Sequence, residues 1–273
     1  MYIDRYAVIG NPIAHSKSPF IHTHFAEQTG QAMEYERLLA PLDGFFDAVT
    51  AFRREGGRGL NVTVPFKLEA YAICDERSPR AELAGAVNTL LFRNDGSIYG
   101  DNTDGVGLVS DLAFHGVTPR DRRVLILGAG GAVRGVLAPL LQTQPMELVI
   151  ANRSPEKAIE LAHTFADMGL VHGCGYETLN GHAFDLIING TSASLGGELP
   201  PLPEDVLSPG GIAYDMAYGK DETPFQHWAR AHGAAQALDG LGMLVEQAAE
   251  SFQLWRGLRP DTRPVRESLN ALR

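Results

Sequence analysis

Short apolar runs rich in valine, isoleucine and leucine alternate along this chain with longer segments of helical hydrophobic periodicity. This alternation is typical of βαβ units, in which a helix connects two parallel strands of one sheet. Two such series are present, one beginning with residues 6–10 (YAVIG) and one with residues 122–131 (RRVLILGAGG). A chain of 273 residues is long enough for two ordinary domains. The sequence therefore predicts an α/β protein of two α/β domains, with mainly parallel sheets.

In the first series, Ser18, Pro19 and Gly30 bracket a predicted helix: serine as the N-cap, proline at the first position and glycine at the end. The segment VNTLLFRNDGSIYG predicts a β-hairpin around Asn94-Asp95-Gly96. The other predicted elements of this series are strands at 35–39 (YERLL) and 59–64 (GLNVTV) and a helix within 43–57.

In the second series, an apolar strand breaks into a glycine turn and continues as a helix, AVRGVLAPLLQ. Further strands are predicted at ELVIAN, DLIING and GGIAYDM, and residues 241–255 predict an amphipathic helix. We expect one domain to comprise residues 1–103, completed by residues 240–273, and the other to comprise residues 104–239.

Composition excludes several classes of function. A formal net charge of −10 argues against a nucleic-acid partner, because such proteins carry a basic face. No segment approaches the length of apolar sequence that a membrane helix needs, and residues 1–12 do not resemble a signal peptide. Cys74 and Cys174 form no CxxC motif. His22 and His24 point in different directions on a helix, so we expect exposed or partly packed histidines and no metal site. A soluble, cytoplasmic protein with a small-molecule substrate is expected.

The segment LILGAGGAVRG contains the glycine turn between a predicted strand and a predicted helix. Gly128, Gly130 and Gly131 would let the backbone approach a pyrophosphate, which accepts hydrogen bonds from the N–H groups that open the helix. Val133 occupies the third glycine position of the generic pattern, so a plain strand-to-helix turn is the alternative.

The end of the next strand predicts the cofactor. A dinucleotide-binding domain that uses NAD usually has an acidic residue here, which binds the ribose hydroxyls and repels a 2′-phosphate. This chain has Asn152-Arg153-Ser154, followed by Lys157, and two cations with a hydroxyl suit a phosphate. The alternative is a solvated helix start with Ser154 as its cap. We expect NADP, with Arg153 in the leading role.

Three polar clusters in the first series are hard to explain by packing alone. Ser16 follows the first strand and has no capping role in the predicted helix, whereas Ser18 does. Asn61 and Thr63 share one face of their strand, and Pro65 is expected to start a helix that carries Lys67 in its first turn, where the helix dipole disfavours a cation.

Asp104, in the third cluster, opens another predicted helix, where an aspartate is often only a cap. Together, Lys67 and Asp104 form a plausible proton-transfer pair beside a hydride donor.

The segments SKSP, NVTVPFK, AGAVNT, GDNTDG, GAGGAVRG, NRS, YDMAYG and DGLGMLVEQAA occur in this order over residues 16–249, and they resemble the shikimate dehydrogenase family. This resemblance implies a Rossmann-like NADP-binding domain inserted into a catalytic domain, and the reversible reduction of 3-dehydroshikimate to shikimate in aromatic amino-acid biosynthesis. It implies that Lys67 is the acid/base and Asp104 its partner near the reacting oxygen. It implies a substrate site of Ser16, Ser18, Thr63, Asn88, Asp104, Tyr218 and Gln247. It implies an NADP site of Gly128, Ala129, Gly130, Gly131, Ala132, Asn152, Arg153, Ser154, Pro155, Glu156, Lys157, Met216 and Gly240.

Two positions depart from the family pattern, which often has threonine at Ser154 and arginine at Lys157. Both changes keep a hydroxyl and a cation, but lysine cannot bind a phosphate in a bidentate manner. The rival functions are a quinate/shikimate dehydrogenase that uses NAD, and a catalytically silent regulator, which would be expected to lack Lys67 or Asp104. A hydrolase is disfavoured because residues 190–194 lack the second glycine of a nucleophile elbow. The sequence is compatible with a monomer or a homodimer.

Overall fold

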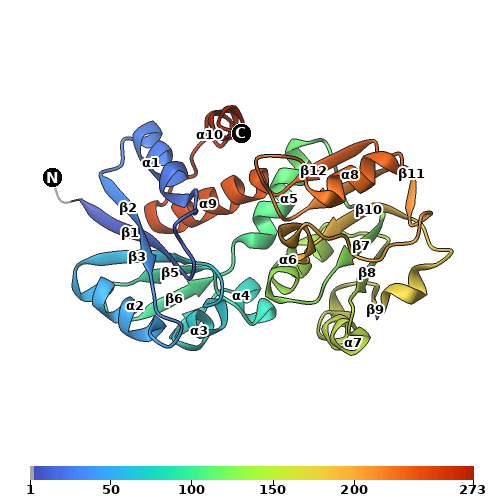
Figure 1. Cartoon of the computed structure of the whole chain (residues 1–273). Helices are drawn as coiled ribbons and strands as arrows, with labels where there is room; N and C mark the ends of the chain where they lie inside the picture. Colours follow the sequence, from blue (N-terminus) through green and yellow to red (C-terminus); the bar gives the residue numbers. More distant parts are fainter. Residues whose placement is uncertain (1–2) are drawn as a thin grey trace. The chain divides into compact units, whose positions relative to one another are not determined.

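The computed structural model describes residues 3–273, which divide into two compact units (Figure 1). Unit 1 extends to Gly107 and resumes over Val245–Leu272, and unit 2 comprises Leu108–Leu244 with Arg273. The chain leaves unit 1 within helix α5 (Asp104–Phe114) and returns within helix α9 (Leu241–Arg256). No helix within residues 3–273 has the length and apolar character that a membrane span requires.

Unit 1 contains a six-stranded sheet with the order β2-β1-β3-β5-β6-β4. Its strands are β1 (Asp4–Gly10), β2 (Met33–Leu39), β3 (Gly57–Val62), β4 (Glu76–Arg77), β5 (Thr89–Phe92) and β6 (Ile98–Asp101). Strand β1 pairs in parallel with β2 and β3, and β4 pairs in parallel with β6. The predicted hairpin is confirmed, since β5 and β6 are antiparallel and β5 also runs antiparallel to β3.

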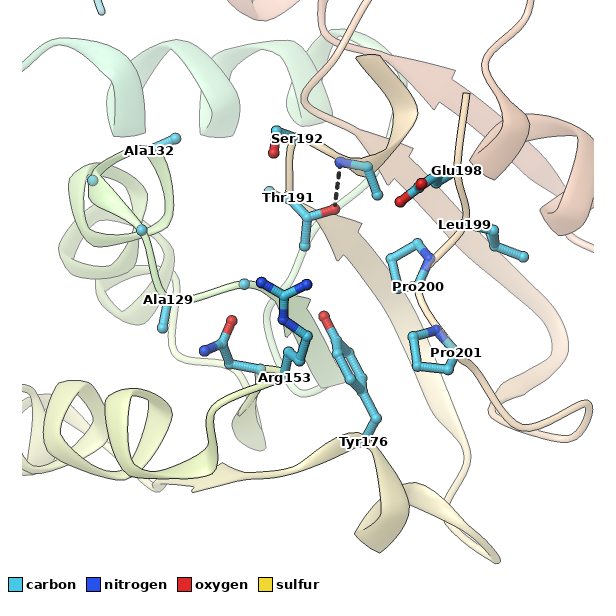
Figure 2. A pocket seen from close by; sticks show the side chains of 16 residues that line it. Ala129, Ala132, Arg153, Tyr176, Thr191, Ser192, Glu198, Leu199, Pro200 and Pro201 are labelled. Atoms are coloured by element: carbon cyan, nitrogen blue, oxygen red, sulfur yellow. Dashed lines mark hydrogen bonds between the residues drawn. The ribbon is translucent and has the colours of Figure 1, made fainter. Parts of the chain in front are cut away.

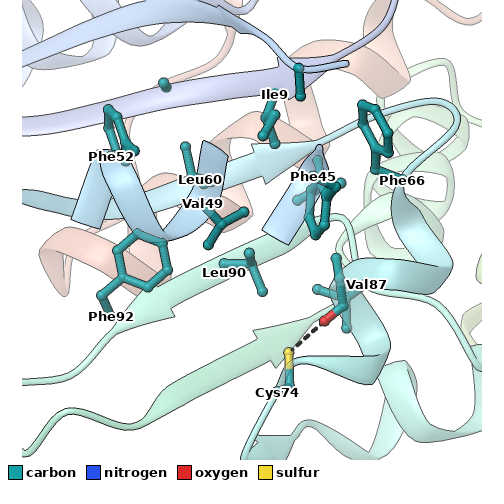
Figure 3. Packing of buried hydrophobic residues seen from close by; sticks show 14 of the residues in the cluster. Ile9, Phe45, Val49, Phe52, Leu60, Phe66, Cys74, Val87, Leu90 and Phe92 are labelled. Atoms are coloured by element: carbon teal, nitrogen blue, oxygen red, sulfur yellow. Dashed lines mark hydrogen bonds between the residues drawn. The ribbon is translucent and has the colours of Figure 1, made fainter. Parts of the chain in front are cut away.

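The helices of unit 1 are α1 (Ser18–Thr29), α2 (Phe45–Arg54), α3 (Lys67–Ala72), α4 (Pro79–Ala84) and α10 (Arg263–Ala271), with parts of α5 and α9. Helix α2 places Phe45, Val49 and Phe52 against Leu60 and Leu90 of the sheet, as Figure 3 shows. Burial of each such side chain stabilises the folded protein by about 1.5–3 kcal/mol relative to an exposed side chain. This cluster fixes the strands whose ends carry the polar residues described below.

Two predicted helix starts are wrong in detail. Helix α1 begins at Ser18 with Lys17 as the N-cap and without a side-chain capping bond, so Ser18 is not the cap; the Ser16 hydroxyl accepts the Ser18 N–H at 3.3 Å. Pro65 does not start α3, which begins at Lys67. Gly30 ends α1 as predicted, with the left-handed φ of 65° that glycine adopts at little cost.

Unit 2 contains a wholly parallel sheet with the order β12-β11-β10-β7-β8-β9. This is the order of a Rossmann fold, in which ligands bind at the carboxyl ends of the strands. The strands are β7 (Arg123–Leu127), β8 (Glu147–Ala151), β9 (Val171–Cys174), β10 (Phe184–Asn189), β11 (Leu207–Asp215) and β12 (Gln236–Asp239), and the α-helices between them are α6 (Gly131–Gln142), α7 (Pro155–Thr164) and α8 (Pro224–Ala231). The sequence did not predict β9 and β12, which are four residues long.

His22 is fully buried, so the expectation of exposed or partly packed histidines is wrong at this position. Its ring stacks on Tyr35 with 4.2 Å between centroids, and Nε2 lies 3.1 Å from Oδ1 of Asn61. Because an amide oxygen only accepts, Nε2 carries the proton and donates it. Nδ1 is then a bare acceptor, and it has no partner among the described residues. Burial lowers the pKa of His22 to about 3, although the bond to Asn61 opposes this shift.

The low pKa of His22 predicts a loss of stability in mild acid. The unfolded chain protonates this ring below about pH 6.5, whereas the folded protein resists protonation down to about pH 3. Stability from the neutral ring is therefore complete above pH 6.5 and is lost as the pH falls. We expect His22→Gln to remove about 1.4 kcal/mol of the loss that wild type shows between pH 7.5 and 5.5, measured by denaturant unfolding. Equal losses in the two proteins would contradict this assignment.

Candidate functional site

Lys67 and Asp104 form an ion pair within unit 1, with 2.5 Å between Nζ and Oδ2. Lys67 opens α3 and Asp104 opens α5, so both side chains project from helix N-termini. Their side chains are 22% and 11% exposed, which leaves the pair partly accessible to a small molecule. The Asp104 carboxylate is not merely a cap, because it bonds Lys67 while the Asn102 side chain accepts the Asp104 N–H.

The side-chain amide of Asn88 holds the other oxygen of Asp104. Asn88 Nδ2 donates to Asp104 Oδ1 at 2.8 Å and to Thr103 Oγ1 at 2.9 Å, and it lies 3.4 Å from Gln247 Oε1. Its Oδ1 accepts the Thr103 N–H. The backbone is fixed as well, because Val87 N–H donates to the Lys67 carbonyl. Four of the predicted residues, Lys67, Asn88, Asp104 and Gln247, therefore meet at one place.

A second set of buried polar residues lies behind Asn88. Asn61 Nδ2 donates to Ser251 Oγ at 2.9 Å and to Thr89 Oγ1 at 3.2 Å, and Thr89 Oγ1 donates to Asn88 Oδ1. Asn61 Oδ1 accepts the Tyr35 hydroxyl at 2.7 Å. The sequence pointed to Asn61 but not to Thr89, Ser251 or Tyr35. Ser251 had one available signal, since it lies one helical turn after Gln247.

The remaining predicted substrate residues have fewer recorded contacts. Ser18 is buried and its side chain interacts with the Tyr35 hydroxyl, which joins it to the set around Asn61. Ser16 holds the start of α1, and its carbonyl accepts the Arg37 guanidinium. Thr63 follows β3, and its methyl group occupies the space where Gly10 would have a Cβ. Tyr218 belongs to unit 2, where burial raises its pKa.

Unit 2 contains a pocket of about 480 Å³ at the carboxyl ends of its strands (Figure 2). It is lined by Gly128, Ala129, Gly130, Gly131, Ala132, Asn152, Arg153, Tyr176, Gly190, Thr191, Ser192, Ala193, Glu198, Leu199, Pro200 and Pro201. The glycine loop and the end of β8 therefore line one cavity, as the sequence predicts.

The glycine loop leaves the room that a pyrophosphate needs. Added Cβ atoms at Gly130 and Gly131 would meet nothing within 4 Å, and Gly128 has a φ of 101°, which favours glycine. Helix α6 begins at Gly131 without a side-chain cap, so its first N–H groups stay available for an anion. At the Val133 position, the close approach of backbone and helix is provided by Gly190, where a Cβ would lie 2.4 Å from a Val133 methyl carbon.

Arg153 supplies the positive charge of the pocket. Figure 2 shows its guanidinium next to the Tyr176 ring, and its charge opposes the rise in Tyr176 pKa that burial causes. Ser154 occupies the N-cap position of α7, but its hydroxyl makes no capping bond. Pro155, Glu156 and Lys157 form the first turn of α7 and do not line the cavity.

Met216 and Gly240 lie together but outside this cavity. A Cβ at Gly240 would meet the Met216 carbonyl oxygen at 2.2 Å, so only glycine fits this approach. The sequence did not predict three further parts of the lining: Tyr176, residues 198–201 and the segment 190–193 that follows β10. The end of DLIING gave a usable signal for the last of these, because parallel strands present their carboxyl ends at one edge.

Comparison with known proteins identifies the family. The family model described as "Shikimate dehydrogenase substrate binding domain" matches residues 8–90, "Shikimate / quinate 5-dehydrogenase" matches residues 112–195, and "Shikimate 5'-dehydrogenase C-terminal domain" matches residues 240–269. The shikimate dehydrogenase (NADP(+)) of Alkalilimnicola ehrlichii is 62% identical over 263 residues, which cover 96% of this chain and 97% of that relative. The chain belongs to the shikimate dehydrogenase family.

Two solved structures are similar to this chain over nearly its whole length. The Thermus thermophilus shikimate 5-dehydrogenase, determined in complex with NADP(H) and shikimate, has a TM-score of 0.87 at 35% identity and covers 98% of this chain and 99% of its own. An Ael1 enzyme from Pseudomonas putida has a TM-score of 0.92 at 53% identity, covering 97% of this chain and 98% of its own. The predicted family and the predicted α/β fold class are therefore confirmed.

The position of Arg153 predicts that it discriminates between the two nicotinamide cofactors. Arg153→Ala should raise the KM for NADP about tenfold or more, because a charge-assisted bond to the 2′-phosphate is lost, and should change the KM for NAD little. Steady-state kinetics with each cofactor give the comparison, and Arg120→Ala, at an exposed site of unit 2, is the control. Equal losses for both cofactors would assign Arg153 to the adenine face or to structure.

Proposed function

We propose that this chain reduces 3-dehydroshikimate to shikimate with NADPH, reversibly, and that Lys67 and Asp104 form its proton-transfer pair. The observation that carries the proposal is the Lys67–Asp104 ion pair held by Asn88 beside Gln247. A hydroxyl-bearing carboxylate such as shikimate would find a cation, a carboxylate and two amides there. The Alkalilimnicola ehrlichii relative is a shikimate dehydrogenase (NADP(+)), and the Thermus thermophilus shikimate 5-dehydrogenase was determined in complex with NADP(H) and shikimate, which supports the same activity here.

NADPH, held by the residues that line the unit 2 pocket, would supply the hydride that reduces the carbonyl carbon of 3-dehydroshikimate. The carbonyl oxygen then becomes an alkoxide that must gain one proton. The Lys67 ammonium donates this proton, and in the reverse direction the neutral amine accepts it from the hydroxyl. Asp104 orients the Lys67 ammonium through its Oδ2. It would also accept a hydrogen bond from a substrate hydroxyl.

The network around Asn88 fixes the orientation of the Asp104 carboxylate, which holds the Lys67 ammonium. Asn88 Nδ2 and Lys67 Nζ hold different oxygens of the Asp104 carboxylate, so the carboxylate cannot rotate without losing one bond. A buried polar group that loses its hydrogen-bond partner costs about 1–3 kcal/mol, which makes rotation of the carboxylate unfavourable. Ser16 and Ser18 are proposed to bind the substrate carboxylate, while Thr63, Asn88 and Gln247 are proposed to contact the carboxylate or the ring hydroxyls.

The main rival is a quinate/shikimate dehydrogenase that uses NAD. The absence of an acidic residue at the end of β8, where Asn152 and Arg153 stand, favours NADP. The decisive experiment is a two-by-two assay of shikimate and quinate with NADP and NAD. The proposal requires the highest kcat/KM for shikimate with NADP; a preference for quinate, or for NAD, would overturn it.

Three further expectations stay proposals. Residues 104–239 are proposed to be the NADP-binding domain, within a catalytic domain formed by residues 1–103 and 240–273. The enzyme is proposed to act in the cytoplasm, where its two free cysteines would stay reduced. It is proposed to be a monomer or a homodimer, which sedimentation analysis distinguishes.

Replacement of Lys67 tests the acid/base assignment. Lys67→Ala should lower kcat by roughly 10²-fold or more while the KM for shikimate changes only a few-fold. The measurement is steady-state kinetics together with the melting temperature, since Asp104 loses its cation. Lys220→Ala, at an exposed position, is the matched control. A folded Lys67→Ala enzyme with nearly normal kcat would reduce Lys67 to a surface lysine.

Replacement of Gln247 tests whether helix α9 contributes to the substrate site. An unpaired substrate hydroxyl costs about 1–3 kcal/mol, so Gln247→Ala should lower kcat/KM for shikimate roughly ten- to a hundred-fold. The affinity for NADP and the melting temperature should change little. Gln253→Ala, on the exposed face of the same helix, is the control. A loss of kcat/KM matched by a fall in melting temperature would indicate that Gln247 only completes the core.

A further inference from the structure

The carboxylate of Asp215 is fully buried at the end of β11, and all of its recorded partners are neutral. Its Oδ1 accepts Asn189 Nδ2 and the Ala217 N–H, both at 3.1 Å. Its Oδ2 accepts two hydroxyls, Ser194 at 2.6 Å and Thr223 at 2.7 Å. Burial raises the pKa of Asp215, and the four hydrogen bonds oppose that rise. Such a carboxylate is expensive to bury, so its position requires an explanation.

One branch of this network leads to the wall of the NADP pocket. Asn189 Nδ2 donates to Ser194 Oγ as well as to Asp215, and Asn189 Oδ1 accepts both the N–H and the hydroxyl of Thr191. The Thr191 hydroxyl in turn accepts the Ala193 N–H, as Figure 2 shows. Thr191, Ser192 and Ala193 line the pocket. The hydrogen bonds recorded from residues 191–194 to the strands therefore run through two side chains, Asn189 and Asp215.

The other branch leads away from the pocket. Thr223 caps α8 through a capping box with Gln226, and Gln226 Nε2 donates to the Ala237 carbonyl. This branch joins α8 to β12 and has no residue in the pocket lining. The two hydroxyls on Oδ2 thus have separate roles, one toward the cofactor wall and one toward the fold.

We propose that Ser194, held by Asp215, is a positioning residue that fixes the 191–193 wall for NADP. This proposal rests on the assignment of the unit 2 pocket to NADP. Ser194 does not line the cavity, so it acts through Thr191 and Ala193 and not by contact with the cofactor. Without its hydroxyl, the wall segment loses its direct bond to Asp215 and keeps only the bonds of Thr191 to Asn189. Part of the ordering of this segment then falls to the bound cofactor, which weakens binding.

A matched pair of variants tests the proposal. Ser194→Ala and Thr223→Val each remove one hydroxyl from the same Asp215 oxygen. Ser194→Ala should raise the Kd for NADP roughly five- to thirty-fold, measured by titration of the enzyme with NADP alone, with little change in melting temperature. Thr223→Val should lower the melting temperature, because α8 loses its cap, and should leave the Kd for NADP within about twofold. Ser194→Thr keeps the hydroxyl and should bind NADP nearly as wild type does.

Two results would overturn the proposal: a Ser194→Ala Kd within about twofold of wild type, or equal increases in Kd for Ser194→Ala and Thr223→Val. Either result is distinguishable from failure of the proposed function, because wild-type enzyme that binds NADP and oxidises shikimate would still have the proposed activity. Wild type that does not bind NADP would refute both.

Discussion

The side-chain amide of Asn88 joins three segments that lie far apart in the sequence. Its nitrogen donates toward the start of α5 and toward Gln247 on α9, and its backbone pairs with the ends of β3 and β6. A buried amide of this kind is stabilising only when its donors and acceptors are all used. This requirement sets the geometry of the Lys67–Asp104 pair. The Asn88 amide donates a hydrogen bond to Asp104 Oδ1, and this bond fixes the orientation of the carboxylate.

In unit 2, two glycines position the elements by allowing close contact between backbone and neighbouring atoms. Gly190 lets the end of β10 meet Val133 of α6, and Gly240 lets the start of α9 meet the Met216 carbonyl. A methyl group at either place would overlap atoms at 2.2–2.4 Å, which close packing does not tolerate. The glycine pattern of this chain is therefore only partly a phosphate-binding signal. Gly130 and Gly131 leave space for a ligand, whereas Gly190 and Gly240 are required by contacts within the protein.

The fold was largely predictable because hydrophobic periodicity is a local property. The long apolar strands and the hairpin at Asn94-Asp95-Gly96 were found from the sequence, while the short strands β9 and β12 were not, since four mixed residues carry no clear period. Two polar residues near strand ends, Asn61 and Arg153, were singled out from the sequence, and the structure places Asn61 in a buried polar network and Arg153 in the lining of the unit 2 pocket. Thr89 and Asp215 were not, because their importance lies in bonds to distant segments, and a propensity cannot show such bonds.

The helix termini explain why Lys67 and Asp104 depend on each other. The N-terminus of a helix carries partial positive charge, which favours the Asp104 carboxylate on α5 and disfavours the Lys67 ammonium on α3. The Lys67 ammonium is therefore stabilised by the Asp104 carboxylate and not by the N-terminus of its own helix. A proton donor held in this way is sensitive to any new oxygen that approaches the pair, because that oxygen competes with the carboxylate for the same N–H groups. In the proposed reaction, the ion pair would present the Lys67 proton to the substrate carbonyl, and Asn88 would keep the Asp104 carboxylate in position after the proton had left.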